Sequence, residues 1–108
     1  MQVQKAVYYT KLLDIYGNIL TAKQQSILTD YLCYDNTLSE IATAHNTTRQ
    51  AVKDIIDRTC ARLDDFEEKL HFCQKTQKVL DALRKLSNNK IDSDTQRNIQ
   101  TIIKFMEV

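Results

Sequence analysis

Proline is absent from this sequence, and glycine occurs only once, as Gly17. Because these two residues interrupt helices most strongly, almost nothing in the chain breaks a helix. Long apolar runs are also missing, so we expect no membrane-spanning helix. Leu, Ile, Lys, Gln and Asp recur at helical spacing, in place of the Val/Thr/Tyr alternation typical of strands. We therefore predict an all-α fold.

Cysteine is scarce, and the spacing of the cysteines matches no known paired motif. Cys33, Cys60 and Cys73 are an odd number, and no two form a C-x-x-C motif. The N-terminus also lacks the apolar core of a signal peptide, so we expect a cytoplasmic protein with reduced thiols. His71 stands two residues from Cys73 but has no second close pair of ligands near it. We expect no metal and no cofactor.

No arrangement typical of an enzyme is present. A single glycine cannot form a phosphate-cradling loop, and the Asp64-Asp65 and Glu67-Glu68 carboxylates splay apart on a helix with no nucleophile near them in sequence.

The net charge of the chain limits how strongly it can bind nucleic acid. Fifteen Lys and Arg oppose fourteen Asp and Glu, giving +1, which argues against strong nonspecific binding to nucleic acid.

Helical periodicity and capping residues predict six helices in one domain, residues 1–108. The first runs from about Val3 to Tyr16, and capping boxes at Thr21 and Thr37 open the second and third. We expect Thr48 to cap a long fourth helix reaching about His71. Two C-terminal helices follow within residues 73–108, one ending at 87–89 and the last capped by the box at 93–96.

The third and fourth helices have the spacing of a helix-turn-helix, at about residues 37–62. Ala42 stands where the two helices approach closely and a small side chain is needed. Asn46 stands at the turn, where glycine is commonest, and Asn is the non-glycine residue best able to adopt a left-handed conformation. Fold alone does not establish DNA binding, because this geometry is also used for protein contacts.

The fourth helix is longer than a helix-turn-helix requires. Its apolar or small side chains recur at intervals of four and three residues, and we call this set the α-seam: Val52, Ile56, Thr59, Leu63, Phe66 and Leu70. Two interpretations remain open. The α-seam packs on the first and last helices of its own chain, or residues 48–71 extend past the body and form a homodimer.

Two resemblances follow from these motifs. The stretch LTAKQQSILTDYLCYDNTLSEIATAHNTTRQAVKDIIDR, residues 20–58, resembles the fourth region of bacterial sigma factors, a helical domain built around a helix-turn-helix. LLDIYGNILTAKQQSIL, LSEIATAHNTTRQAVKDIIDRT and LDDFEEKL follow the order and spacing of the YlxM family of small bacterial proteins. This second, closer resemblance covers residues 12–70.

The YlxM resemblance implies a small cytoplasmic protein whose gene lies beside those of the signal recognition particle. It further implies a regulator or accessory factor of that targeting pathway. Asn46 departs from the usual turn glycine, which puts in question the contacts at the tip of the motif rather than the fold.

Early residues of the second helix in a helix-turn-helix reach base edges, while nearby basic and hydroxyl groups hold phosphates. Arg49 would suit guanine and Gln50 adenine. Arg58, Arg62 and Lys69 would form a basic flank along the same helix. The nucleic-acid-binding candidates are Thr48, Arg49, Gln50, Lys53, Arg58, Arg62 and Lys69.

Carboxylates oppose this interpretation. Asp54 and Asp57 share the face of Gln50, where they would repel phosphates, and ion pairs Asp54–Arg58 and Asp65–Lys69 at i,i+4 spacing would make the charges an ordinary solvated face. The alternatives are therefore a sequence-specific reader of duplex DNA and a factor that binds the RNA or a protein of the signal recognition particle. We expect no membrane partner.

Overall fold

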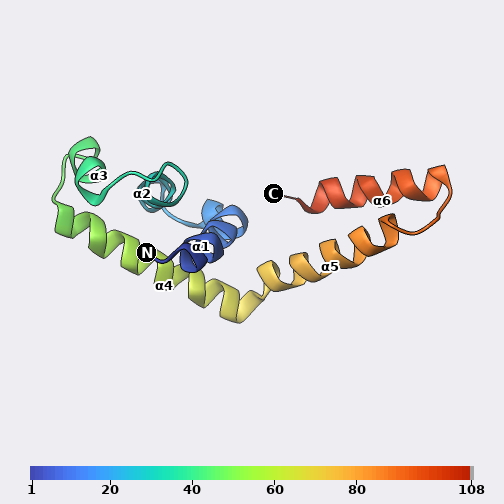
Figure 1. Ribbon diagram of the computed structural model, residues 1–108. Helices are drawn as coiled ribbons and strands as arrows, with labels where there is room; N and C mark the ends of the chain where they lie inside the picture. Colours follow the sequence, from blue (N-terminus) through green and yellow to red (C-terminus); the bar gives the residue numbers. More distant parts are fainter. Residues whose placement is uncertain (108) are drawn as a thin grey trace. The chain divides into compact units, whose positions relative to one another are not determined.

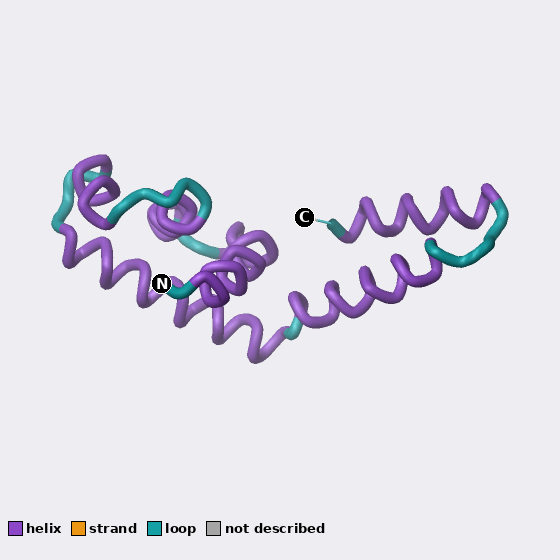
Figure 2. Tube along the Cα trace, in the orientation of Figure 1, coloured by secondary structure: helices purple, strands orange, loops and turns teal. Residues whose placement is uncertain are grey.

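The computed structural model describes residues 1–107, and all of its regular elements in that range are helices, as predicted. It contains six α-helices and one short 3-10 helix (Figure 1), and no strand lies in the part of the chain that is described (Figure 2). The elements are α1 (Val3–Tyr16), η1 (Gly17–Ile19), α2 (Ala22–Leu32), α3 (Leu38–Ala44), α4 (Arg49–Leu70), α5 (Phe72–Ser87) and α6 (Ser93–Met106). None of the described helices combines the length and apolar composition that a membrane span needs.

The chain divides into two compact units. Met1–Leu70 contains α1 to α4 and the helix-turn-helix, and we call it the N-terminal unit; His71–Val108 contains α5 and α6, and we call it the hairpin. The division falls at His71, whose φ of 55° is left-handed and ends the run of α4. Whether residues 1–108 behave as one domain stays a prediction.

Local capping fixes where α2, α3 and α4 begin. Thr21 and Thr37 each accept a hydrogen bond from the backbone N–H three residues on, and the Gln24 and Glu40 side chains accept one in return. Thr48 Oγ1 accepts from the Ala51 N–H at 3.1 Å. These three caps confirm the sequence predictions. They were predictable because each cap depends only on neighbouring residues.

The cap of α6 differs from the prediction. Asp92, rather than Ser93, is the N-cap: its carboxylate accepts hydrogen bonds from the Thr95 N–H at 2.7 Å and the Thr95 hydroxyl at 3.0 Å. An ionised carboxylate is a stronger acceptor than a serine hydroxyl at the positive end of a helix, so the cap lies one residue earlier.

The core of the N-terminal unit forms where α4 lies against α1, α2 and α3. Val52, Thr59 and Leu63 of the α-seam are fully buried, and the Thr59 hydroxyl is satisfied by donating to the Ile55 carbonyl at 2.6 Å. The α-seam thus packs on the first helix, as one of the two interpretations held, and also on α2 and α3. Its packing on the last helix stays a prediction. A homodimer through residues 48–71 stays a prediction, for which this buried part of the α-seam is not available.

Two tyrosines join α1 to the C-terminal half of α4. Tyr9 Oη donates to Asp64 Oδ2 at 2.8 Å, and Tyr16 Oη donates to Glu67 Oε1 at 2.6 Å. Tyr16 is also 1% exposed and its ring lies 5.7 Å from that of Phe66. Two carboxylates of the acidic run are therefore engaged in holding α1 in place.

Candidate nucleic-acid interface

The helix-turn-helix has the local geometry that its sequence predicts. Ala42 of α3 is buried, and its carbonyl accepts from the Thr47 N–H at 2.9 Å across the turn. Asn46 adopts the expected left-handed conformation, with φ of 53°. On the other side of the turn, His45 Nε2 lies 3.3 Å from Asp30 Oδ2 of α2. The turn therefore presents the first residues of α4 in a fixed place.

Thr48, Arg49 and Gln50 are all exposed at this end of α4. Arg49 makes no hydrogen bond or ion pair with any residue in the described range. Thr48 is partly committed, because its hydroxyl caps the helix. The exposed positions thus match those from which a helix-turn-helix reads a partner.

The next two candidates, Gln50 and Lys53, are hydrogen-bonded to carboxylates on α4. Gln50 Nε2 donates to Asp54 Oδ1 at 3.0 Å, and Lys53 Nζ donates to Asp57 Oδ2 at 2.9 Å. The hydrogen bond and charge of Asp57 raise the pKa of Lys53 above its ordinary value. The expected pair of Asp54 with Arg58 is not what the structure has, because Gln50, one turn earlier on the same face, supplies the donor instead.

The basic flank is interrupted in the same way. Arg62 turns toward the body of the N-terminal unit, where it donates to Gln24 Oε1 at 3.0 Å and to the Ile19 carbonyl at 3.4 Å. Its guanidinium also lies 5.2 Å from the centre of the Phe66 ring. Lys69 pairs with Asp65 at 3.0 Å, as expected. Among the described residues, Arg58 alone in this flank has no polar partner.

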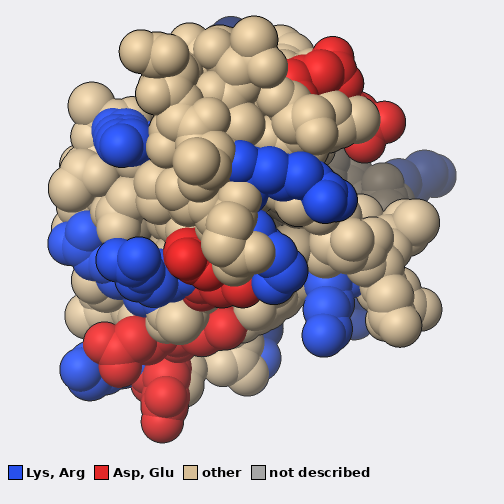
Figure 3. All heavy atoms as spheres, turned by 90° about the vertical axis from the view of Figure 1, so that its left-hand side faces the viewer, with Lys and Arg blue, Asp and Glu red and all other residues tan. Residues whose placement is uncertain are grey.

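Charge is divided unequally between the two units. The N-terminal unit has eight Lys and Arg against ten Asp and Glu, whereas residues 71–108 have seven against four. The helix-turn-helix therefore belongs to a net acidic unit, and the hairpin is the basic one. At the end where α3 meets α4, Lys and Arg side chains are interleaved with Asp and Glu (Figure 3). Such a mixed surface attracts phosphates weakly.

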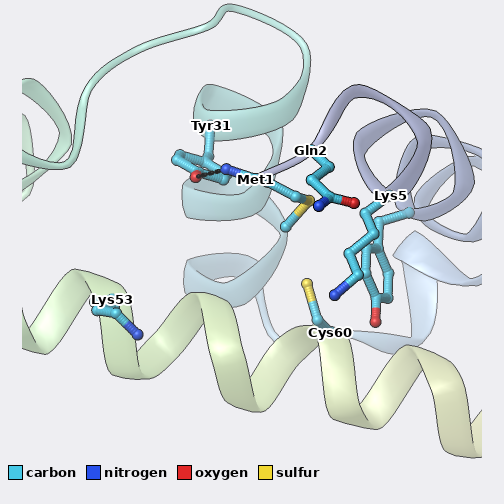
Figure 4. Close-up of a pocket in the computed structure, with 7 residues that line it drawn as sticks. Met1, Gln2, Lys5, Tyr31, Lys53 and Cys60 are labelled. Carbon is cyan, nitrogen blue, oxygen red and sulfur yellow. Dashed lines mark hydrogen bonds between the residues drawn. The ribbon is translucent and has the colours of Figure 1, made fainter.

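A shallow hollow of about 650 Å³ lies on the N-terminal unit between α1, α2 and α4, with the candidate Lys53 on its edge (Figure 4). Lys5, Lys53, Tyr31 and Cys60 are among its lining residues. Burial, together with the charges of Asp64 and Asp57, raises the pKa of the Cys60 thiol to about 11. The thiol is therefore protonated at neutral pH and is a poor nucleophile.

No three potential metal ligands gather anywhere in the described part of the chain.

The Tyr9–Asp64 hydrogen bond predicts a stability loss in alkali. Burial first, and the hydrogen bond and charge of Asp64 next, raise the pKa of Tyr9 above its ordinary value. A raised pKa means that the folded state holds the proton more tightly, so this stabilisation is present below about pH 10 and is lost as pH rises above it. In urea unfolding between about pH 9 and 11, the free energy of unfolding should fall more steeply with pH in the wild type than in Tyr9→Phe. Tyr34→Phe, at a side chain that is 69% exposed, should behave like the wild type; equal slopes for all three proteins would contradict the prediction.

Comparison with known proteins places these features in a family context. The UPF0122 family, described as "Putative helix-turn-helix protein, YlxM / p13 like", matches residues 3–103. A UPF0122 protein of Bacillus licheniformis is 39% identical over 98 residues, covering 88% of this chain and 92% of the relative. The UPF0122 protein YlxM of Bacillus subtilis is 36% identical over 107 residues, covering 99% and 97%. A UPF0122 protein of Fusobacterium nucleatum is 37% identical over 103 residues, covering 95% and 96%.

Proposed function

Because this chain belongs to the YlxM / p13-like helix-turn-helix family, we propose that it is a regulatory or accessory protein of the signal recognition particle pathway. Its partner is the RNA or a protein of that particle, and it acts in the cytoplasm. The link to this pathway rests on the family resemblance. The choice of partner rests on the charge of the helix-turn-helix.

The observation that carries the choice of partner is the pairing on the exposed face of α4. A DNA reader needs Gln50 and Lys53 to be available to bases and phosphates, yet each is hydrogen-bonded to a carboxylate one turn further along. Displacing these carboxylates would still leave two negative charges facing the DNA backbone. Together with the acidic balance of the N-terminal unit, this favours a partner whose recognition does not depend on phosphate neutralisation by α4.

The hairpin supports an RNA partner in particular. It carries the basic excess of the chain, and Lys and Arg on it are suited to following a phosphate backbone. Double-helical RNA has a major groove too narrow for a helix, so binding through backbone shape needs basic side chains rather than a recognition helix. Under this proposal the nucleic-acid contacts lie in residues 71–108, and α4 contributes Arg58 at most.

A second candidate function, sequence-specific binding of duplex DNA, is favoured by Arg49 and Arg58. Both are exposed, and neither has a polar partner among residues 1–107. Arg49 stands where an arginine contacts guanine in a helix-turn-helix. Thr48, Gln50 and Lys53 would complete this interface.

We propose further that the protein is not an enzyme. The buried Cys60 thiol is protonated at neutral pH, and hydrogen bonds to tyrosines engage the Asp64 and Glu67 carboxylates. These two carboxylates belong to the acidic run that the sequence analysis considered for catalysis. Each instead accepts a hydrogen bond that joins α1 to α4.

The double variant Gln50→Ala, Lys53→Ala separates the two functions. Both side chains are exposed, so the fold should be unaffected. Binding to the RNA or protein of the signal recognition particle should stay within about threefold of the wild type, because α4 contributes little to it. For a DNA reader, a footprint on duplex DNA should instead be abolished. Loss of both kinds of binding would show that the two surfaces are not separate, and would contradict the proposal.

A further inference from the structure

The hollow between α1, α2 and α4 differs in charge from the unit that carries it. Lys5 of α1 and Lys53 of α4 both line it, and none of its described lining residues is a carboxylate. The N-terminal unit as a whole has more Asp and Glu than Lys and Arg. A concave surface lined by charges of one sign concentrates counter-ions of the other sign, so this hollow is suited to an anion.

The two lysines reach the hollow from different helices, and their side chains extend toward one another across it (Figure 4). Lys5 is exposed and makes no hydrogen bond or ion pair with any residue in the described range. Lys53 is paired with Asp57 at 2.9 Å, which uses one of its three N–H donors. Both ammonium groups therefore have donors available to a ligand.

Tyr31 of α2 supplies a further donor. Its Oη accepts from the Met1 amino group at 3.4 Å, while its own O–H has no acceptor within residues 1–107. Tyr31 also lies near enough to Lys53 for the two groups to interact electrostatically. Three helices thus bring hydrogen-bond donors to one hollow, and the oxygens of phosphate groups accept strongly from such donors.

The rest of the lining is apolar or aromatic. The residues are Met1, Tyr9, Tyr31 and Cys60, and the hydrogen bond of Tyr9 to Asp64 at 2.8 Å holds the Tyr9 ring in place. A volume of about 650 Å³ lies in the range of sites for small organic ligands and exceeds what a lone phosphate fills. Aromatic rings bind the flat faces of nucleobases by stacking.

We propose that this hollow binds a purine nucleoside diphosphate, with its phosphates held by Lys5 and Lys53 and its base against a tyrosine ring. Two ammonium groups on separate helices suit two phosphate groups, because each makes a charge-assisted hydrogen bond to an anionic oxygen. The proposal does not depend on which macromolecule the protein binds, and it is tested without one.

Two carboxylates near the hollow limit the expected affinity. Asp57 and Asp64 both lie close enough to act on the Cys60 thiol, although neither lines the hollow. Asp64 accepts from Tyr9, and Asp57 accepts from Lys53. A phosphate that binds Lys53 must compete with Asp57 for the same ammonium group. We therefore expect a dissociation constant on the order of 100 µM.

An NMR titration of the ¹⁵N-labelled full chain with ADP and with GDP tests the proposal. At least one of them should bind saturably, and the amide shifts should be confined to α1, α2 and α4. Lys5→Gln and Lys53→Gln should each weaken binding at least about tenfold, because each removes a charge-assisted contact. Both side chains are exposed, so these variants should keep the fold.

Lys11→Gln and Lys69→Gln are the matched controls. They make the same change on the same two helices but outside the hollow, and Lys69, like Lys53, is paired with an aspartate one turn further along. Both should bind the nucleotide within about twofold of the wild type. An equal loss in all four variants would show a general effect of charge and would overturn the proposal.

Adenosine and inorganic phosphate separate the two halves of the ligand. Each should bind at least about tenfold more weakly than the nucleotide, because each makes only part of the contacts. Inorganic phosphate that binds as tightly as the nucleotide would overturn the proposal, as would adenosine that does so. Two further results would do the same: no saturable binding of ADP or GDP up to about 5 mM, or shifts that lie in residues 72–106 of the basic hairpin in place of the N-terminal unit.

Discussion

Leu63→Ala is expected to lower the free energy of unfolding of the N-terminal unit by about 3 kcal/mol, the largest effect of any single change considered. Leu63 is 0% exposed and lies on α4, which packs against three other helices of this unit. Removing its side chain loses the transfer free energy of the buried atoms and leaves a cavity. For a unit of this size, the midpoint of thermal unfolding should fall by roughly 12 to 24 °C.

Leu70→Ala is the matched control for this prediction. It makes the same chemical change on the same helix, but Leu70 is 38% exposed and should cost less than about 1 kcal/mol. Urea unfolding followed by circular dichroism measures both. If the two variants were equally stable, the α-seam would not be buried within its own chain, and pairing of residues 48–71 between two copies would become the better interpretation.

Asp54→Asn, Asp57→Asn is expected to increase the affinity for duplex DNA about tenfold at low salt. Each carboxylate at about 7 Å from a phosphate in water contributes roughly 0.6 kcal/mol of repulsion, and two such terms correspond to nearly one decade. The double change also frees Lys53 from its pairing with Asp57. The gain should fade toward about 0.5 M salt, where such interactions are screened.

The double variant Asp14→Asn, Asp65→Asn has the same net charge as the Asp54→Asn, Asp57→Asn protein. It therefore controls for a general loss of negative charge. Both residues are exposed in the N-terminal unit, and Asp65 is likewise paired with a lysine, Lys69. Fluorescence anisotropy with a labelled duplex should give a clearly smaller gain for this control. An equal gain in both proteins would show that Asp54 and Asp57 have no specific part in excluding DNA.

Predictions from local chemistry were the most accurate. The caps at Thr21, Thr37 and Thr48 depend on residues at most three positions away, so the sequence contains all of the relevant information. The left-handed Asn46 is of the same kind, because few other residues tolerate that conformation. The family comparisons confirm the helix-turn-helix that these signals indicated.

Competition between equivalent partners limited the prediction of the site. Asp54 has Arg58 and Gln50 at the same spacing on either side, and only the folded helix shows that Gln50 donates to it. Arg62 has the sequence position of a solvent-facing arginine on the basic flank. Its turn toward Gln24 and Ile19 depends on η1 and α2, which lie about 40 positions away in the chain.

Long-range pairings could not be found from the sequence at all. Tyr9 and Asp64 are 55 positions apart, and Tyr16 and Glu67 are 51 apart. No local pattern relates such residues. The end of α4 at about His71 was predicted, but the left-handed conformation of His71 was not, because histidine is not a usual helix breaker.

The central claim of the proposal is that this protein binds the RNA or a protein of the signal recognition particle rather than duplex DNA. The most direct test is a titration of the wild-type protein against duplex DNA and against the particle's RNA at two salt concentrations, with the particle's protein subunit as a parallel target. The account predicts a saturable complex with the RNA or the protein, and only weak binding to DNA. Saturable DNA binding with a steep salt dependence, and no complex with either component of the particle, would contradict it and identify a transcription factor.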